Sequence, residues 1–454
     1  AIDLANGLFR VTNRFYFTNL KKYMVHYSVT ANNKVVRSGK VSLDIEPQAS
    51  KEFTVPVGNL KPQAGTEYFV NFNVTTVEKE PLIPIGHEIA CDQFRLPIEN
   101  PKKAFKTSGP KLTVSTNGDN LSASSSKVNF VFNRKTGIVT SYKVDGTEYF
   151  SEGFGIQPNF WRAPTDNDYG NGMPKRLQVW KESSKNFNVT DATVTMDGNN
   201  AVVNVNYLLP AGNLYIVNYT IYPSGAVNVA ARFTSTDMDA APTEVSESTR
   251  TATFTPGRDA ARKEASKLNV PRIGVRFRLP ASMNQVEYFG RGPAENYLDR
   301  NAGSMVGLYK STAEELYFPY VRPQENGHHT DTRWVSLSTG KKGLLIQADN
   351  TIGFNALRNS IEDFDDEEAT GLSRQWSNFT PEQVANHDEA AAKNVLRRQH
   401  HINDITPRDF VEVCVDLKQQ GVAGYDSWGS RPEPAYTLPA NREYNWGFTL
   451  IPLK

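Results

Sequence analysis

Apolar and polar residues alternate along most of this 454-residue chain. The clearest cases are residues 23–29, 67–74, 201–207, 215–221 and 410–416, each rich in aromatic and β-branched side chains. Successive side chains of a β-strand point to opposite faces, so a period of two indicates strands with one buried face. The same residue types pack well on a pleated surface. The alternation therefore predicts an all-β protein.

A polar stretch divides this alternating pattern into two parts. About seven short strands are expected in residues 1–98, which is typical of an immunoglobulin-like β-sandwich. Residues 99–111 are polar, contain two prolines and are predicted to form a linker. Residues 112–454 hold too many strands for an eight-stranded barrel. They predict one large antiparallel double-sheet sandwich.

One helix is expected inside the second part, near residues 380–397. Thr380 offers an N-cap hydroxyl, Pro381 suits the first helical position, and Gln383 can close a capping box. The Ala-rich stretch that follows can propagate the helix. The sequence therefore predicts a single helical exception in an all-β chain.

Composition limits the partners of this chain. Its 50 basic and 49 acidic side chains nearly cancel, so no long-range field is expected to attract nucleic acid or an anionic membrane. The chain lacks a run of about 18 apolar residues, so we expect no membrane span. Hydrophobic residues make up 39% of the chain, which is enough for substantial cores and argues against disorder.

The two cysteines and the start of the chain carry less information. Cys91 and Cys414 are far apart, so we expect neither a disulfide framework nor a zinc site. Both are predicted to be small buried hydrophobic side chains. This leaves the compartment open between cytoplasm and periplasm. The chain begins without Met or a leader and enters strand-like sequence at once, so we expect a fragment of a longer protein.

Four irregular segments interrupt the strands, at residues 160–172, 286–300, 320–327 and 421–429. Each mixes Gly or Pro with charged and aromatic residues. Loops on a rigid β scaffold are the usual place for binding and catalytic residues. We therefore expect any functional site to be built from these four segments.

The segments resemble the C-terminal sandwich of the large β-galactosidases of glycoside hydrolase family 2. Residues 160–170 resemble the family pattern R-A-P-x-D-N-D-x-G, and residues 290–300 resemble G-x-G-P-x-E-N-Y-x-D-R. Residues 320–327 resemble P-Y-V-x-P-x-E-N-G, and residues 424–429 resemble the G-x-D-S-W turn. Residues 8–97 are similar to the small immunoglobulin-like domain that precedes this sandwich.

The resemblance implies a galactose mutarotase-like supersandwich within an enzyme that hydrolyses terminal β-D-galactosides with retention. In that family, two Glu residues of a central (β/α)₈ barrel act as nucleophile and acid/base, roughly 5 Å apart. The barrel is expected to precede residue 1, in the same polypeptide or as a separate large subunit, and to carry Mg²⁺ and Na⁺. This chain is then expected to supply scaffold and active-site wall and to be inactive alone, with no catalytic residue, metal or cofactor. The family also forms large assemblies, so a homo-oligomer is expected.

Some site residues carry over from the family motifs. Trp428 matches the aromatic residue that projects into the active-site mouth, where its indole offers an apolar plane to a sugar. The residues after Gly170 match a mobile loop that closes over galactose, with Gly170 as hinge because Gly reaches dihedral angles that other residues avoid. The matching loop residues are Gly170, Asn171 and Gly172. Tyr425 departs from the family, which often has a carboxylate there.

Asp166, Asn167 and Asp168 are expected to brace this loop. Two other interpretations of the three residues stay open. They suit an Asx-rich turn without a ligand. Their oxygens also suit a hard cation, although the spacing alone is weak support.

Four carboxylate and histidine residues allow other interpretations. Glu295 and Glu325 are expected to brace loops through backbone hydrogen bonds rather than to form a catalytic pair. A rival hypothesis is a free-standing mutarotase-like isomerase, with Glu325 and either His328 or His400 as acid and base. Another rival is a non-catalytic galactoside-binding module, which would lose lactose affinity in Trp428→Ala.

Three polar groups, one acidic run and two histidine pairs, are expected to hold no ligand. The acidic run at residues 362–368 is predicted to be a solvated loop. His328–His329 and His400–His401 are adjacent pairs whose side chains point to opposite faces of a strand. We therefore expect neither pair to share a metal ion.

Overall fold

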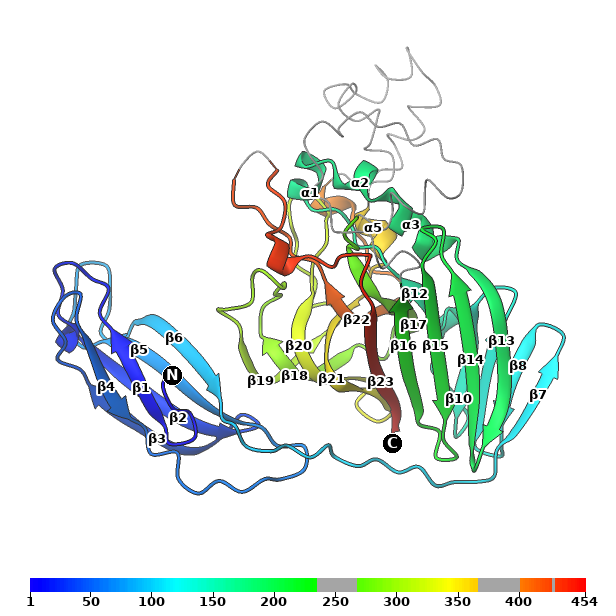
Figure 1. Cartoon of the computed structure of the whole chain (residues 1–454), viewed down its shortest axis with the longest axis horizontal. Coiled ribbons are helices and arrows are strands. Elements are labelled where there is room, and N and C mark those ends of the chain that lie inside the picture. The colour runs from blue at the N-terminus through cyan, green and yellow to red at the C-terminus, as the bar shows by residue number, and fades with distance from the viewer. Residues whose placement is uncertain (235–267, 366–400, 427–428) are drawn as a thin grey trace, which may run out of the picture. The chain divides into compact units, whose positions relative to one another are not determined.

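The structure is a computed structural model, which describes residues 1–234, 268–365, 401–426 and 429–454. It divides into two compact units (Figure 1). Unit 1 comprises residues 1–105 and 302–308, and unit 2 comprises residues 106–301 and 309–454. The expected helix at residues 380–397 lies outside the described residues.

Unit 1 is a small antiparallel sandwich. A two-stranded sheet of order β1-β4 faces a four-stranded sheet of order β3-β2-β5-β6. Six strands are described here rather than the expected seven: β1 (Leu8–Thr12), β2 (Tyr23–Ala31), β3 (Lys34–Ser42), β4 (Ser50–Thr54), β5 (Tyr68–Thr76) and β6 (Glu88–Arg95). Its core combines valines with aromatic side chains, and the Phe9 ring lies edge-on to Phe72 at a centroid distance of 4.8 Å.

Unit 2 contains a five-stranded and a much larger antiparallel sheet. The smaller has the order β11-β10-β9-β8-β7 and the larger contains β12 to β23. The first set is β7 (Thr113–Asn117), β8 (Asn120–Ser124), β9 (Val128–Asn133), β10 (Ile138–Val144) and β11 (Thr147–Glu148). The second set is β12 (Gln157–Asn159), β13 (Asn188–Asp197), β14 (Asn200–Leu208), β15 (Leu214–Ile221), β16 (Val227–Thr234), β17 (Arg272–Pro280), β18 (Gln285–Gly292), β19 (Met305–Thr312), β20 (His329–Ser338), β21 (Gly343–Leu357), β22 (Phe410–Gln419) and β23 (Tyr444–Leu453).

The main order of the large sheet is β12-β17-β22-β21-β23-β16-β15-β14-β13, and β20 pairs with β21. Strict alternation builds its buried face, as in β14, where Ala201, Val203, Val205 and Tyr207 are all buried. The two sheets share one core, because Phe130 of β9 packs on Tyr219 of β15 with ring centroids 5.5 Å apart. The all-β, antiparallel fold class is confirmed.

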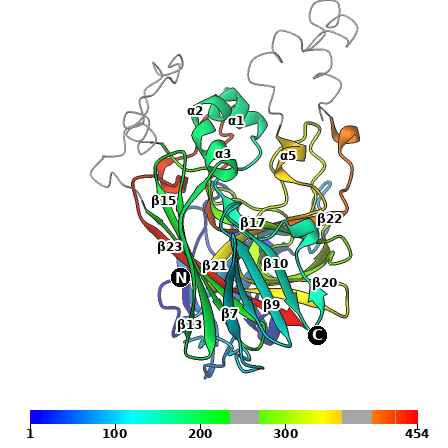
Figure 2. The same cartoon turned by 90° about the vertical axis from the view of Figure 1, so that its right-hand side faces the viewer.

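Short helices gather at one end of the unit 2 strands (Figures 1 and 2). They are α1 (Asp166–Gly170), α2 (Met173–Arg176), α3 (Gln178–Lys185) and α5 (Ile361–Phe364). Single 3₁₀ turns are described at Leu20–Lys22 in unit 1 and at Ser151–Gly153, Ile402–Asp404 and Pro434–Tyr436 in unit 2. The prediction of an irregular loop at residues 160–172 is therefore wrong for its second half. The missed signal is Thr165, which caps α1 and forms a capping box with Asp168.

Two predictions about side-chain burial are corrected. Cys414 is buried, but Cys91 is exposed because it lies on β6, an edge strand that is mostly exposed. The first part of the acidic run is not a solvated loop, since Asp363 and Asp365 are buried. Asp363 receives hydrogen bonds from Arg408, and Asp365 accepts one from the Trp161 indole at 2.7 Å. Residues 366–368 lie outside the described residues.

Candidate functional site: four converging segments

The four irregular segments of the sequence meet at the helix-bearing end of unit 2. The segment at residues 160–172 contacts the last segment through Asn167, whose amide donates to the carbonyls of Val422 at 3.2 Å and Ser430 at 2.7 Å. It contacts the third segment through Asp166, which accepts from the Gln324 side chain at 3.0 Å. Residues about 160 and 260 positions apart in sequence are thus neighbours in space.

Arg162 fixes the first segment from within. Its guanidinium donates to both oxygens of the Asp168 carboxylate, at 3.0 and 2.9 Å, and both side chains are buried. The same guanidinium donates to the carbonyls of Gln420 and Gly421. Each of the two buried charges thus has its partner. Through its bonds to Asp168, Gln420 and Gly421, Arg162 connects the first turn of α1 to the end of β22.

Two glycines let the first and last segments approach closely. A Cβ added to Gly170 would lie 3.1 Å from the Cα of Gly429. A Cβ on Gly429 would lie 2.5 Å from the carbonyl carbon of Gly170, and Gly429 also has a left-handed φ of 85°. Gly170 itself has a helical backbone, and the left-handed residue of this loop is Gly172, with φ 73°. Because Gly170 has no side chain, its backbone can lie directly against the backbone of Gly429 in this structure.

The second segment holds the same turn from the other side. The Asp299 carboxylate accepts hydrogen bonds from the backbone N–H groups of Val422 and Ala423, at 3.0 and 2.8 Å. Arg300 donates to the carbonyl of Ala423 at 3.2 Å. Ala423 has φ 54°, a left-handed backbone that L-residues rarely adopt. The conformation of the turn that leads to Trp428 is therefore determined by side chains from a distant segment.

A buried polar network lies beneath this turn. Arg272 is fully buried and donates to Glu325 at 3.1 Å and to Asn355 at 2.8 Å, while its Nε lies 3.2 Å from Asp416. Glu325 also accepts from Gln419 at 2.9 Å. Burial raises the pKa of Asp416 to about 7; Arg272 opposes this rise, and the Glu325 charge adds to it. Glu325 thus bonds to side chains. The prediction that it braces a loop through backbone hydrogen bonds is wrong in this respect.

Glu295 does brace the backbone, because it accepts a hydrogen bond from the N–H of Gly327 at 2.6 Å. It also accepts one from the Tyr320 hydroxyl. Burial raises the pKa of Glu295, although these two hydrogen bonds lower it. The second and third segments are joined in this way.

The adjacent histidines point to different surroundings. His328 contacts Asn355 through Nδ1 at 2.9 Å and stacks on Tyr297, whereas His329 lies near the carbonyls of Gly327 and Pro293. Burial lowers the pKa of both imidazoles, that of His329 to about 4. Both side chains are therefore neutral structural groups at neutral pH.

The rival isomerase needs a sugar beside Glu325, and the cavity there is too small. It has a volume of about 20 Å³ and is lined by Arg272, Glu325, Asn355 and Cys414, among others. One water molecule needs a cavity of about this size. His400, the other histidine of that hypothesis, lies outside the described residues.

The structure brings most of the expected site residues together. Asp166, Asn167 and Asp168 each contact a different partner, and among the described residues no group of three His, Cys, Asp or Glu side chains could hold a metal ion. Trp428 lies outside the described residues. Arg272 and Asp416 were not predicted from the sequence. The one sequence feature that points to them is that each is a charged residue within a mostly apolar strand.

No helix in the described ranges is both long and apolar enough to cross a bilayer.

Comparison with known proteins gives the family. Residues 124–450 match the family described as "Beta galactosidase small chain", and residues 9–97 match "Beta-galactosidase, domain 4". The chain is 30% identical to a β-galactosidase of Priestia megaterium over 457 residues, and 24% identical to one of Streptococcus thermophilus over 450. These alignments cover 100% and 98% of this chain but only 38% and 37% of the relatives.

Among solved structures, a galactose mutarotase related enzyme from Lactobacillus acidophilus covers 74% of the chain at 10% identity with a TM-score of 0.36, and 97% of that enzyme is aligned. A galactose mutarotase-like protein from Lactobacillus casei covers 75% at 10% identity with a TM-score of 0.32, and is aligned over its whole length. The sequence matches, by contrast, span both units and include all four converging segments. The chain belongs to the β-galactosidase small-chain family.

Proposed function

We propose that this chain is the C-terminal part of a β-galactosidase that hydrolyses terminal non-reducing β-D-galactosides with retention of configuration. The convergence of the four segments at one end of unit 2 carries the proposal. That end presents a turn held by Asp299, Arg300 and Asn167, and the turn leads directly to Trp428. A turn held this firmly suits a wall that offers an aromatic plane to a sugar.

The catalytic carboxylates belong to the rest of the enzyme in this proposal. A retaining glycosidase needs two carboxyl groups about 5 Å apart on either side of the glycosidic bond. Glu325 is bound to Arg272, and Glu295 to Tyr320 and Gly327, so both carboxylates already have structural partners. A (β/α)₈ barrel on the same polypeptide or on a separate large subunit supplies the nucleophile and acid/base, together with Mg²⁺ and Na⁺.

The part of unit 2 around the four segments then contacts the barrel. Exposed apolar side chains lie in the third and fourth segments, with Val321 77% and Tyr425 56% exposed. Phe318, just before the third segment, is 50% exposed. Exposed apolar groups beside an ordered polar network are typical of a surface that another domain covers. Loop closure through Gly170, Asn171 and Gly172 over bound galactose belongs to the same proposal.

Hydrolysis of a chromogenic β-galactoside tests the proposal. We expect no turnover by this chain alone and turnover when it is mixed with the remainder of the enzyme. Trp428→Ala should then reduce the activity of the mixture, while Tyr436→Ala serves as a control for another partly exposed aromatic side chain. Robust turnover by the chain alone, abolished by Glu295→Gln or Glu325→Gln, would overturn the proposal.

A further inference from the structure

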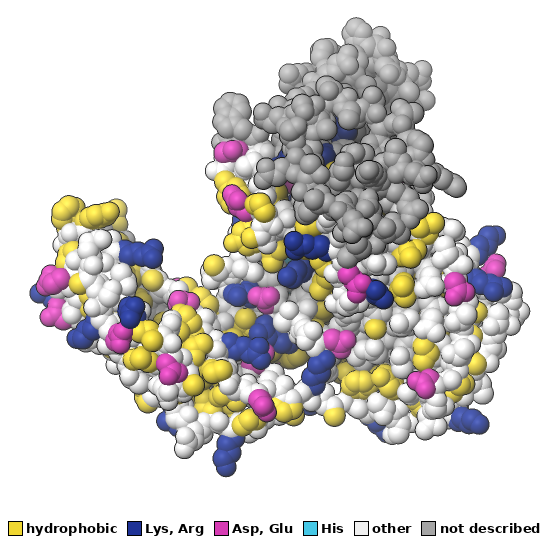
Figure 3. Space-filling view, viewed as in Figure 1, with side chains coloured by type: hydrophobic (Ala, Val, Ile, Leu, Met, Phe, Trp, Pro, Cys, Tyr) yellow, Lys and Arg dark blue, Asp and Glu magenta, His cyan; other side chains and the backbone are white. Residues whose placement is uncertain are grey.

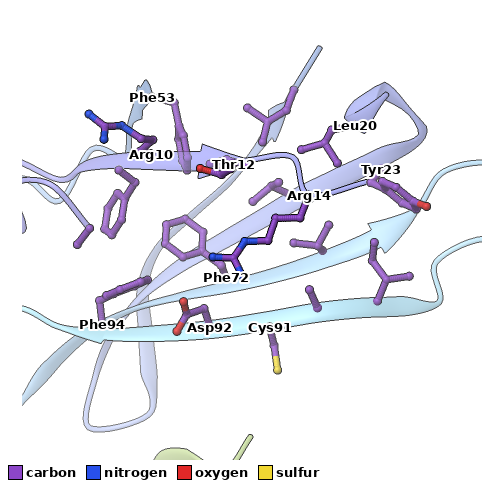
Figure 4. A pocket seen from close by; sticks show the side chains of 18 of the residues that line it. Arg10, Thr12, Arg14, Leu20, Tyr23, Phe53, Phe72, Cys91, Asp92 and Phe94 are labelled. Carbon is purple, nitrogen blue, oxygen red and sulfur yellow. The ribbon is translucent and has the colours of Figure 1, made fainter. Parts of the chain in front are cut away.

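A buried charge is more informative than an exposed one, because burial requires a partner at a defined place. On the visible face of the molecule, acidic and basic side chains are mixed with hydrophobic ones (Figure 3). The groove of about 560 Å³ in unit 1 has mainly apolar residues in its walls, among them Phe53, Phe72 and Phe94 (Figure 4). In unit 2, by contrast, the buried carboxylate of Asp365 has partners at both ends of one loop.

The loop at residues 162–179 leaves and re-enters the sandwich at one neck. It follows β12 and reaches α3. The backbone N–H of Phe160 donates to the Ser184 hydroxyl at 2.7 Å, and the Phe160 and Trp180 rings have centroids 6.3 Å apart. The chain segments that enter and leave the loop are therefore neighbours, as in other compact loops whose ends are close together. Residues 170–172, which are expected to close over galactose, lie in the middle of this loop.

One oxygen of Asp365 holds both sides of this neck. The Trp161 indole N–H donates to Asp365 Oδ2 at 2.7 Å, and Lys181 Nζ lies 2.7 Å from the same oxygen. Lys181 Nζ also lies 5.8 Å from the centre of the Trp161 ring. The Asp365 and Lys181 side chains are only 4% and 15% exposed, and Trp161 is buried. A hydrogen bond and an ion pair thus meet at one carboxylate in surroundings where both are stronger than in water.

Asp365 is itself held in place by α5, because it caps the C-terminal end of this helix. Arg276 of β17 donates to both oxygens of the Glu362 carboxylate, at 2.7 and 2.8 Å. Arg408 donates to Asp363 at 3.1 Å. The helix therefore connects Asp365 to a strand of the large sheet.

We propose that Asp365 is a positioning residue for the reaction of the complete enzyme. By holding Trp161 and Lys181 at one oxygen, it fixes the neck of the loop, and so sets where residues 170–172 lie when they close over bound galactose. This role rests on the proposed function, in which the loop contacts the sugar. Asp365 acts through the loop and does not itself contact the substrate.

The neck and the tip of the loop are attached to different parts of unit 2. At the tip, Asn167 donates to Ser430 at 2.7 Å and Asp166 accepts from Gln324 at 3.0 Å, so the tip contacts the turns of the fourth and third segments. The neck is attached to the large sheet through α5. Since a displacement of about 1 Å in a positioning group can reduce a rate about a hundredfold, a loosened neck should slow the reaction.

Kinetics of the complete enzyme test this role. Lys181→Gln removes the ion pair from the neck, and its matched control, Arg408→Gln, removes a cation from Asp363 on the same helix but outside the loop. We expect Lys181→Gln to lower kcat about tenfold and to change KM less than about twofold, because loop closure stabilises the transition state more than the bound substrate. Arg408→Gln should keep both constants within about twofold of the natural enzyme. Lys181→Arg keeps the charge and should restore most of the lost activity.

Amide hydrogen exchange of the full 454-residue chain tests the neck without a sugar. The amides of Arg176 and Leu177 bond to carbonyls within the same loop, at 3.0 and 2.8 Å. Lys181→Gln and Asp365→Asn should speed exchange at both amides by about tenfold, while Arg408→Gln should not, and the amides of β14 serve as internal controls. If Asp365→Asn does not fold, Lys181→Gln still decides the outcome.

Three results would overturn the positioning role. One is a kcat of Lys181→Gln equal to that of the natural enzyme, whether or not exchange is faster. Another is unchanged exchange at Arg176 and Leu177. The third is an equal loss of activity in Lys181→Gln and Arg408→Gln, which would show a general weakening of α5. Hydrolysis by this chain alone would contradict the proposed function, yet the exchange experiment would still show whether Asp365 holds the neck.

Discussion

The Arg162 guanidinium and the Asp168 carboxylate form a two-bond pair at 3.0 and 2.9 Å in which neither side chain is exposed. The pair lies within one segment, yet it connects α1 to the end of β22 through the carbonyl of Gly421, which also accepts from Arg162. Removing one partner of a buried pair leaves an uncompensated charge. The pair is therefore a sensitive test of how the four segments hold together.

Asp168→Asn should lower the free energy of unfolding of unit 2 by about 3–5 kcal/mol, because Arg162 would remain buried without a counter-charge. Urea denaturation followed by tryptophan fluorescence measures this. The matched control is Asp119→Asn, which breaks an exposed pair with Arg134 and should cost less than about 1 kcal/mol. Equal losses in the two variants would contradict the structural role of Asp168.

The contact between Gly170 and Gly429 predicts a difference between two glycine substitutions. Gly172→Ala meets open space and should cost only the left-handed backbone penalty, about 1–2 kcal/mol. Gly429→Ala meets the backbone of Gly170 as well, so overpacking should add about 1–3 kcal/mol. Thermal or urea unfolding of both variants measures the difference. An equal cost for the two would show that the first and last segments are not in contact.

His329 predicts a loss of stability in mild acid. Burial lowers the pKa of this imidazole to about 4 from its usual 6.5. Between these pH values the unfolded chain therefore binds a proton at His329 that the native state does not bind. The stabilising contribution is complete above pH 6.5 and is lost as the pH falls toward 4, by about 3 kcal/mol in all. The difference in unfolding free energy between the natural chain and His329→Gln should therefore shrink from pH 7 to pH 4. A constant difference would mean that His329 takes up a proton as readily in the native state as in the unfolded chain.

Asp416 predicts the opposite dependence of stability on pH. Burial raises the pKa of this carboxyl to about 7 from its usual 3.8, so between these values the native state holds a proton that the unfolded chain has released. The contribution of Asp416 to stability is complete below pH 3.8 and is lost as the pH rises to 7. The unfolding free energy of Asp416→Asn, relative to that of the natural chain, should thus increase by a few kcal/mol from pH 4 to pH 7. If this relative free energy increased on lowering the pH instead, Arg272 would be keeping the carboxylate ionised.

The sequence by itself determined the strands and the family. Alternation at residues 201–207 and 215–221 depends only on neighbouring residues, since side chains of a strand point to opposite faces in turn, and both stretches are strands whose buried face is the expected one. The four motifs likewise identify the β-galactosidase family without knowledge of any contact. A local signal for α1, the Thr165 capping box, was also present but was not used.

Only the tertiary structure decided what these residues contact. Asn167 reaches Ser430, and Arg272 reaches both Glu325 and Asp416, across separations that no local pattern encodes. The burial of Cys91 was predicted wrongly for the same reason, because an edge strand and a central strand can share one alternating sequence. Burial and pKa depend on which strands become neighbours in the sheet, and the folded chain as a whole sets that order.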